Sequence, residues 1–188
     1  MALTYPRITR VTAVDVRSRH TRLLLILVTA ALSLWGCAKK DAATTPPLLT
    51  ETSPSVEALC ERILQALAAS DTLTLHQVCL TRYEHDSVLV PNMPIGQADV
   101  SKDLDFAWYL LVMGRQKGIR RALSDYGGQI LELVRVQFMT APEQYGPLTV
   151  HRKISVTVRD ETGQELPLGI FGSVVEHHGQ FKLVSIVD

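Results

Sequence analysis

The sequence predicts an α+β fold in which N-terminal helices pack on a curved antiparallel meander sheet. From Ser55 to about Tyr83, apolar residues recur every three or four positions, the spacing of helices that bury one face, and further helical segments are expected up to Tyr126. After Gly128, apolar and polar residues alternate in short runs separated by turn sequences, which is typical of strands. Helices followed by strands in this order indicate helices on one face of an antiparallel sheet.

Two helices are expected first. Ser55 is a good N-cap, and a helix is predicted from it to about Ala69. Asp71 can cap a second helix. The apolar positions of the two helices are Val56, Leu59, Cys60, Ile63, Leu64 and Leu67, followed by Leu73, Leu75, Val78, Cys79 and Tyr83.

Proline and glycine residues predict a loop over residues 86–101. Residues 106–113 are apolar all round, which predicts a buried helical segment. Gly114 and Gly118 are expected to interrupt this segment. A short final helix is then predicted to end at Gly127-Gly128, a pattern typical of a C-cap.

Four strands are predicted in the last third of the chain. They cover residues 130–139, 150–158, 165–175 and 181–187, and the second has the cleanest alternation of apolar and polar residues. The sequences Asp160-Glu161-Thr162-Gly163 and His177-His178-Gly179 are the predicted turns that follow the second and third strands.

The first 36 residues have the layout of an export signal. They carry five arginines and one aspartate, and Leu23–Leu34 is an almost pure apolar run. A transmembrane helix needs about 20 apolar residues, so this run is short for one. A basic region followed by roughly 7–15 apolar residues is instead the pattern of a secretory signal peptide, which we assign to residues 1–36.

Leu34-Trp35-Gly36-Cys37 closes this segment and resembles the lipobox of bacterial lipoproteins. The resemblance implies cleavage before Cys37 and lipidation of its sulfur, and two or three acyl chains give stable membrane anchoring. Ala38, in place of an aspartate, implies sorting to the outer membrane, facing the periplasm. The alternatives are an uncleaved N-terminal anchor, or an ordinary signal peptide with an incidental cysteine.

Residues 37–54 are expected to form the lipidated cysteine and a flexible tether, because prolines, serines and threonines dominate this stretch. The folded domain is then residues 55–188. Without the signal peptide the chain is acidic, since the formal charge of the full sequence is zero and residues 1–36 contribute +4. An acidic chain argues against nucleic acid as a partner.

The domain resembles the cystatin-like roll, the superfamily of nuclear transport factor two. The resemblance is carried by Ala66-Leu67-Ala68-Ala69-Ser70-Asp71 between the first two helices and by the closing Gly179-Gln180-Phe181-Lys182-Leu183-Val184-Ser185-Ile186. It implies a cone between helices and sheet. This roll hosts enzymes, binders and scaffolds, so the resemblance does not fix a function.

Two cysteines remain once Cys37 is assigned to lipid. A disulfide between Cys60 and Cys79 is expected, because the compartment is oxidising and the two lie at similar distances from the turn between the first two helices. The alternative is a pair of buried free thiols in a helical interface.

If the cone is catalytic, it needs an ionisable group in an apolar pocket for proton transfer. The candidates are Tyr83, Asp105, Tyr109 and Arg152; pairing of Arg152 with Glu176 across the sheet is the structural alternative. No histidine or cysteine spacing indicates a metal site, and no motif indicates a cofactor. We therefore expect a lipid-anchored binding or scaffolding domain, with an envelope protein or a small molecule as its partner.

Overall fold

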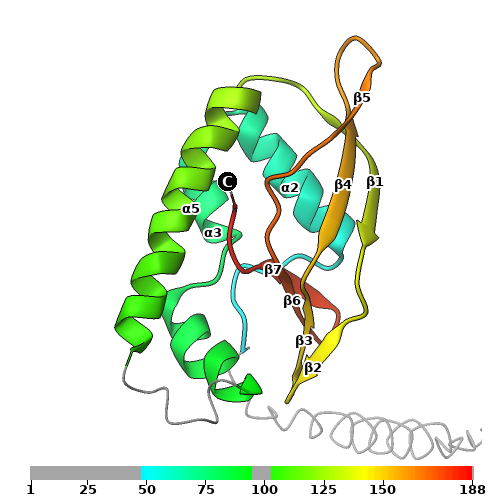
Figure 1. The fold of residues 1–188 in the computed structure, drawn as a ribbon. Helices are drawn as coiled ribbons and strands as arrows, with labels where there is room; N and C mark the ends of the chain where they lie inside the picture. Colours follow the sequence, from blue (N-terminus) through cyan, green and yellow to red (C-terminus); the bar gives the residue numbers. More distant parts are fainter. Residues whose placement is uncertain (1–47, 95–102, 188) are drawn as a thin grey trace, which may run out of the picture. The chain divides into compact units, whose positions relative to one another are not determined.

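The computed structural model describes residues 48–94 and 103–187. The predicted signal peptide 1–36, Cys37, the predicted tether up to Pro47 and the end of the predicted loop lie outside these residues. The helices are α2 (Val56–Ala68), α3 (Thr72–Gln77), a π-helix η1 (Glu84–Leu89) that continues into a short 3-10 turn η2 (Val90–Asn92), and α5 (Leu104–Tyr126). The strands are β1 (Glu132–Phe138), β2 (Glu143–Tyr145), β3 (Leu148–His151), β4 (Ile154–Arg159), β5 (Glu165–Pro167), β6 (Val174–His177) and β7 (Gln180–Leu183). Helices followed by antiparallel strands confirm the α+β class (Figure 1).

The predicted caps begin the first two helices. The Ser55 Oγ accepts a hydrogen bond from the Ala58 amide at 3.1 Å, and the Asp71 carboxylate accepts one from the Thr74 amide at the same distance. The second helix is shorter than predicted. It ends at Gln77 because the next residues pair with β7, where the Leu183 amide donates to the Val78 carbonyl at 3.0 Å.

The predicted loop at residues 86–101 is wrong for its described first part. Thr81 and Glu84 form a capping box: the Thr81 amide donates to the Glu84 carboxylate at 2.7 Å, and the Glu84 amide donates to the Thr81 hydroxyl at 3.2 Å. The helix that follows buries Val88 and Leu89. The prolines and glycine on which the loop prediction depended come after this capped start.

Helix α5 runs without interruption through both glycines that were expected to break it. At Gly118, an added Cβ would lie 2.8 Å from the carbonyl oxygens of Ile186 and Val187. Glycine therefore allows the end of the chain to pass close to the helix backbone. The helix stops at Tyr126 as predicted, with Gly127 as its C-cap and a positive φ of 78° at Gly128.

The strands form two sheets, with orders β1-β4-β5 and β2-β3-β6-β7. All pairings between these strands are antiparallel. Along the chain, consecutive strands alternate between the two sheets: β1 belongs to the first, β2 and β3 to the second, β4 and β5 to the first, and β6 and β7 to the second. The predicted strand 150–158 is therefore two strands, β3 and β4, separated by two consecutive exposed residues, Arg152 and Lys153. Likewise the predicted strand 165–175 breaks after Pro167, which has no amide hydrogen for a ladder.

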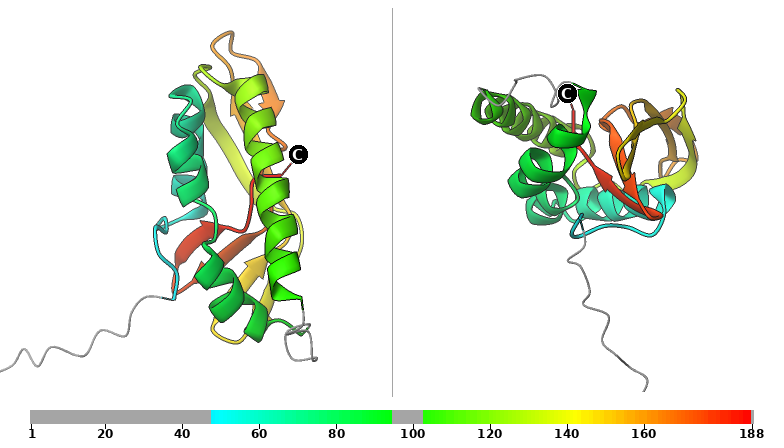
Figure 2. Two further views of the ribbon diagram at one scale, coloured as in Figure 1. Left: turned by 90° about the vertical axis from the view of Figure 1, so that its left-hand side faces the viewer. Right: turned by 90° about the horizontal axis from the view of Figure 1, so that it is seen from below.

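Two apolar cores hold these elements together. The larger core joins α2, α3 and the inner side of α5 to both sheets. The fully buried residues at its centre are Leu59, Cys60, Ile63, Leu67, Leu75, Val78, Ala122, Val158, Val174, Leu183 and Ile186. The smaller core lies between the π-helix and β3 and β6 and consists of Leu49, Leu80, Val88, Leu89, Leu148, Val150 and Val175. Figure 2 shows the helices on one side of the strands in two further views.

Residues 48–53, here called the N-terminal strap, belong to the folded domain. Leu49 and Ser53 are buried, and Ser53 pairs with Phe181 through two backbone hydrogen bonds of 2.9 and 2.8 Å. The predicted domain boundary at Ser55 is therefore several residues too late. The leucine pair at 48–49 is the sequence signal for the strap, since it is the one apolar pair in the predicted tether.

The predicted disulfide is wrong. Cys60 and Cys79 are both free and buried, and the Cys79 thiol lies 3.4 Å from the Leu75 carbonyl oxygen. The prediction assumed two long antiparallel helices with both cysteines at the same level. Cys79 instead follows the end of α3 and pairs with Leu183 in a parallel bridge, which removes it from that arrangement.

Candidate functional site

The four predicted pocket residues do not come together in the structure. Tyr83 is 70% exposed and Tyr109 is 56% exposed, both outside the cores. Asp105 is also exposed and pairs with Arg82. Arg152 donates to Glu143 at 2.6 Å and to the Tyr145 hydroxyl at 2.9 Å, at the outer edge of β2. The predicted cone site built from these residues is therefore not formed.

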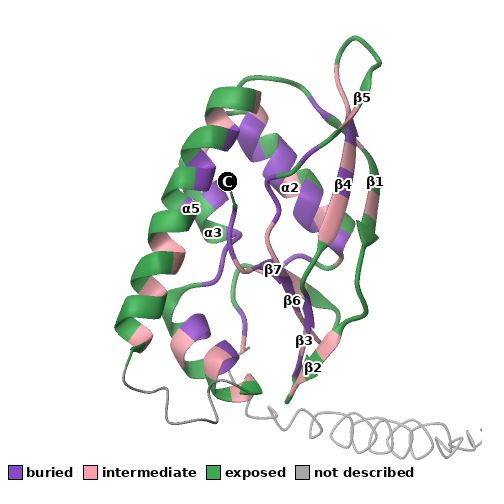
Figure 3. Cartoon of the chain, in the orientation of Figure 1, coloured by how far each residue is buried: buried purple, intermediate pink, exposed green. Residues whose placement is uncertain are grey.

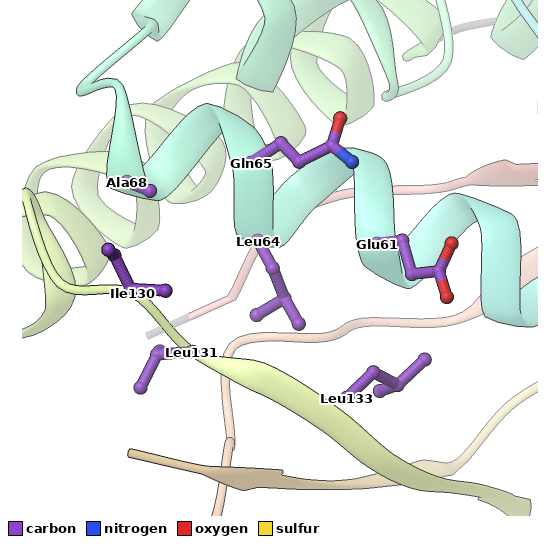
Figure 4. A pocket seen from close by; sticks show the side chains of 7 residues that line it. All are labelled: Glu61, Leu64, Gln65, Ala68, Ile130, Leu131 and Leu133. Atoms are coloured by element: carbon purple, nitrogen blue, oxygen red, sulfur yellow. The ribbon is translucent and has the colours of Figure 1, made fainter. Parts of the chain in front are cut away.

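Two hollows of the described surface are small. One of about 160 Å³ lies between α2 and the start of β1, and Figure 4 shows its lining. Its lining residues are Glu61, Leu64, Gln65, Ala68, Ile130, Leu131 and Leu133. A second, of about 110 Å³, lies beside the end of α5. Ligand pockets usually measure roughly 300–1,000 Å³, so neither hollow has the size of a typical small-molecule site.

One partly buried ionisable pair lies on the strands, with the His151 side chain buried and the Glu176 side chain 29% exposed. The His151 Nε2 is 3.0 Å from the Glu176 carboxylate. Glu176 therefore pairs with His151, and the alternative pairing of Glu176 with Arg152 is wrong, because Arg152 pairs with Glu143. The Phe138 ring stacks on the imidazole at 3.9 Å between centroids, and Phe181 lies 6.4 Å away. The Nδ1 atom is buried without a hydrogen-bond partner among the described residues. His151 lines neither of the two hollows, and stacking by Phe138 covers the ring.

The most distinctive surface feature is an apolar stripe on the outer side of α5, here called the α5 stripe. It consists of Phe106, Tyr109, Leu110 and Met113, whose exposed fractions are 54%, 56%, 54% and 45%. These positions are spaced i, i+3, i+4 and i+7, so the four side chains share one face of the helix. Figure 3 shows the outer side of α5 as mostly exposed. The predicted burial of residues 106–113 is wrong for this half of the helix.

The inner side of the same helix is firmly attached. Arg115 is buried and donates to the carbonyl oxygens of Leu80 and Val184 at 2.9 and 3.2 Å. Its guanidinium also lies 5.5 Å from the centre of the Trp108 ring, within cation–π range. Burial lowers the pKa of Arg115. These contacts fix the helix, so the α5 stripe is presented on a rigid support.

The outer face of α5 changes charge along its length. Asp103 precedes the stripe by three residues, and Lys117 follows Met113 by four, so both continue the same helix face. Asp103 is the N-cap residue but makes no side-chain capping hydrogen bond. Arg120 and Arg121 extend the basic end. The face therefore runs from an acid, through four large apolar side chains, to bases.

The α5 stripe was not recognised from the sequence, although its residues were. Residues 106–113 contain both the inner residues Trp108, Leu111 and Val112 and the outer stripe, so the segment is apolar all round. The signal that separates the two sides is the change at Lys117 and Arg120, which continue the outer face and not the inner one. A cluster of basic residues that continues one helix face indicates that this face is exposed, although a single base of the same helix, Arg115, is buried on the inner side.

In the part of the chain that the structure describes, no group of three or more histidine, cysteine or acidic side chains is placed to hold a metal ion. Among the same residues, no helix combines the length and apolar character that crossing a membrane requires. No protein family, curated protein or solved structure matches this chain.

Proposed function

We propose that this chain is a lipid-anchored protein of the bacterial cell envelope whose α+β domain docks another protein through the α5 stripe. The single observation that carries the docking role is the stripe itself. Four large apolar side chains, each about half exposed, lie together on a helix whose inner side is fixed by buried contacts. A contiguous exposed apolar patch of this kind marks an interaction surface in soluble domains.

The alternative of proton-transfer chemistry in a cone has less support. Its four candidate residues are all exposed, and Phe138 stacks on the His151 ring of the partly buried His151–Glu176 pair. The two hollows are also too small for a typical substrate pocket. A protein partner on the outside of α5 needs no hollow, so the observed surface favours docking over catalysis or small-molecule binding.

The finer fold assignment is part of the proposal. The strand pairing fits a meander of long strands that are each broken midway. If β1 and β2 form one long strand, β3 and β4 the next, and β5 and β6 the third, each long strand pairs with the one that follows it, and β7 pairs last with β6. Helices lie on one side of these strands (Figure 1). This order supports a cystatin-like roll, whose outer helix face carries the docking stripe.

The anchor rests on the likeness of Leu34-Trp35-Gly36-Cys37 to a lipobox, and Ala38 favours the outer membrane, facing the periplasm. Cys37→Ser should abolish labelling of the full chain by radioactive palmitate and release the domain from the membrane fraction. Wild-type chain in the same cells is the control. Continued labelling of the Cys37→Ser chain would contradict the anchor but not the docking role.

The docking role is tested by photo-crosslinking of the full chain in cells. A benzophenone amino acid in place of Tyr109 should give adducts with protein, because it lies in the centre of the α5 stripe. The matched control carries the same group in place of Thr162, which is exposed on the β4–β5 turn. Protein adducts no more abundant at position 109 than at position 162 would overturn the proposed function.

A further inference from the structure

We infer that the partner of the α5 stripe is a second copy of this chain, paired antiparallel through α5. The inference rests on the proposed function of the stripe as a docking surface, and it names the occupant. It is argued from the symmetry of the residues along the outer face of α5 and from the opposite charges at its two ends.

The apolar part of the face is nearly symmetric about a point between Tyr109 and Leu110. In an antiparallel pair with a twofold axis at this point, Phe106 of one copy faces Met113 of the other, and Tyr109 faces Leu110. Each large side chain therefore has an apolar partner, as an isologous interface requires. The interface needs only the residues that the structure leaves half exposed.

The charges at the two ends are complementary in this arrangement. With a rise of about 1.5 Å per residue, Asp103 lies about 10 Å from the axis on one side and Lys117 about 11 Å on the other. Antiparallel pairing therefore places each Asp103 opposite Lys117 of the second copy, twice per dimer. A parallel pair would instead place Asp103 beside Asp103 and Lys117 beside Lys117.

The acid of this pair is available for such a contact. Asp105 is already bound by Arg82, whereas the Asp103 carboxylate caps no amide of its own helix. An anionic lipid surface is a poorer fit to this face, because Asp103 at one end would be repelled by it. Anchoring both copies in one membrane raises their effective concentration, so a small interface suffices.

Cysteine crosslinking of the full chain in the bacterial envelope tests the inference. Leu110→Cys lies next to the axis and should give oxidised dimers of twice the chain mass, whereas Thr162→Cys should not. Wild type measures the background from Cys37, Cys60 and Cys79. Co-expressed Phe106→Cys and Met113→Cys chains should crosslink to each other more than either does to itself, which distinguishes antiparallel from parallel pairing.

A charge exchange tests the complementarity without touching the stripe. Asp103→Lys should lower the Leu110→Cys dimer yield about fivefold, because two exposed ion pairs are lost and replaced by repulsion. Adding Lys117→Glu to that variant should restore the yield. If the dimer yield of the double variant does not recover, although its thermal unfolding matches that of the single variant, the pairing is overturned. Equal crosslinking at positions 110 and 162 would also overturn it.

The benzophenone group at position 109 separates the two proposals. Adducts between two copies of the chain support both. Adducts with a different envelope protein overturn the second copy as the occupant and leave the docking role standing. Adducts with lipid alone, or none above the Thr162 control, overturn both.

Discussion

The Lys182 ammonium lies 3.0 and 2.9 Å from the two carboxylate oxygens of Glu84, and both side chains are almost completely buried. Every other hydrogen-bonding position of the pair is used as well. Glu84 accepts from the Thr50 amide and hydroxyl and from the Thr81 amide, and Lys182 donates to the Thr50 carbonyl at 2.6 Å. The pair thus joins β7, the π-helix and the N-terminal strap.

Removing one member of this pair should be strongly destabilising. Lys182→Met leaves the Glu84 carboxylate buried without a counter-ion, which we expect to lower the free energy of unfolding by roughly 3–5 kcal/mol. Lys182→Met combined with Glu84→Gln should lose less, because the glutamine is neutral yet still accepts from Thr50 and Thr81. Urea unfolding followed by circular dichroism measures both.

The matched control for that experiment is an exposed arginine. Arg159 pairs with Glu132 and Glu165 at 3.2 and 2.9 Å on the surface. Arg159→Met should change the free energy of unfolding by less than about 1 kcal/mol, since exposed ion pairs contribute little. Equal losses for Arg159→Met and Lys182→Met would contradict the structural importance of the buried pair.

Glu84 should also make stability depend on pH. Burial alone would raise the pKa of Glu84, but hydrogen bonds from Thr50 and Thr81 and the Lys182 ammonium outweigh burial and lower it below the ordinary value of 4.5. A carboxylate with a lowered folded-state pKa stabilises the fold above its unfolded-state pKa and loses that contribution as pH falls through the folded-state value.

Unfolding of wild type and of the Glu84→Gln/Lys182→Met variant, measured from neutral pH to well below 4.5, isolates this effect. The free energy of unfolding should fall more steeply for wild type on the acid side. Surface carboxylates such as Asp71 and Asp160, whose pKa values are lowered by hydrogen bonds to neighbouring threonines, contribute equally to both proteins. Parallel curves would show that Glu84 does not titrate as described.

Two glycines in α5 should respond to alanine with opposite signs. An added Cβ at Gly114 meets nothing within 4 Å, so Gly114→Ala should raise the free energy of unfolding by about 0.5–1 kcal/mol through helix propensity. At Gly118 the same Cβ would approach two backbone carbonyls at 2.8 Å, so Gly118→Ala should lower it by roughly 1–3 kcal/mol. Thermal unfolding ranks the two variants, and stabilisation by both would contradict the close approach at Gly118.

The buried cysteines should be free and unreactive in the folded chain. Burial, with help from the nearby carboxylates of Glu57 and Glu61, raises the pKa of Cys60 to about 12, and burial also raises the pKa of Cys79. Little thiolate exists at neutral pH, so alkylation by iodoacetamide should be slow until denaturant is added. Mass spectrometry then counts the labelled thiols; a gain of two hydrogens on reduction would show a disulfide instead.

The structure was predictable from the sequence where the signal is local. Three local signals are confirmed: the cap at Ser55, the spacing of apolar residues up to Leu67, and the stop at Gly127-Gly128. Each belongs to the helix that it predicts or directly adjoins it. The capping box of Thr81 and Glu84 is equally local, but the prolines that follow it predict a loop and mask this signal.

Other features depend on contacts between distant residues. Lys182 stands between apolar residues of a strand, and its burial requires Glu84, 98 positions earlier. The break between β3 and β4 depends on which sheet each half joins, which alternation alone does not specify. The α5 stripe was missed for the same reason: an apolar side chain on a helix is buried or exposed according to what packs against it.

Under the proposed anchor at Cys37, a force on the membrane attachment would enter the domain from its N-terminal side. Any load that passes into the domain arrives at Leu48 and is met first by Thr50, clamped between Glu84 and Lys182, and then by Ser53 on Phe181. These bonds attach the strap to β7 and to the π-helix, which belong to two different parts of the fold. A force that enters the domain at the strap is therefore shared between β7 and the π-helix before it reaches α2.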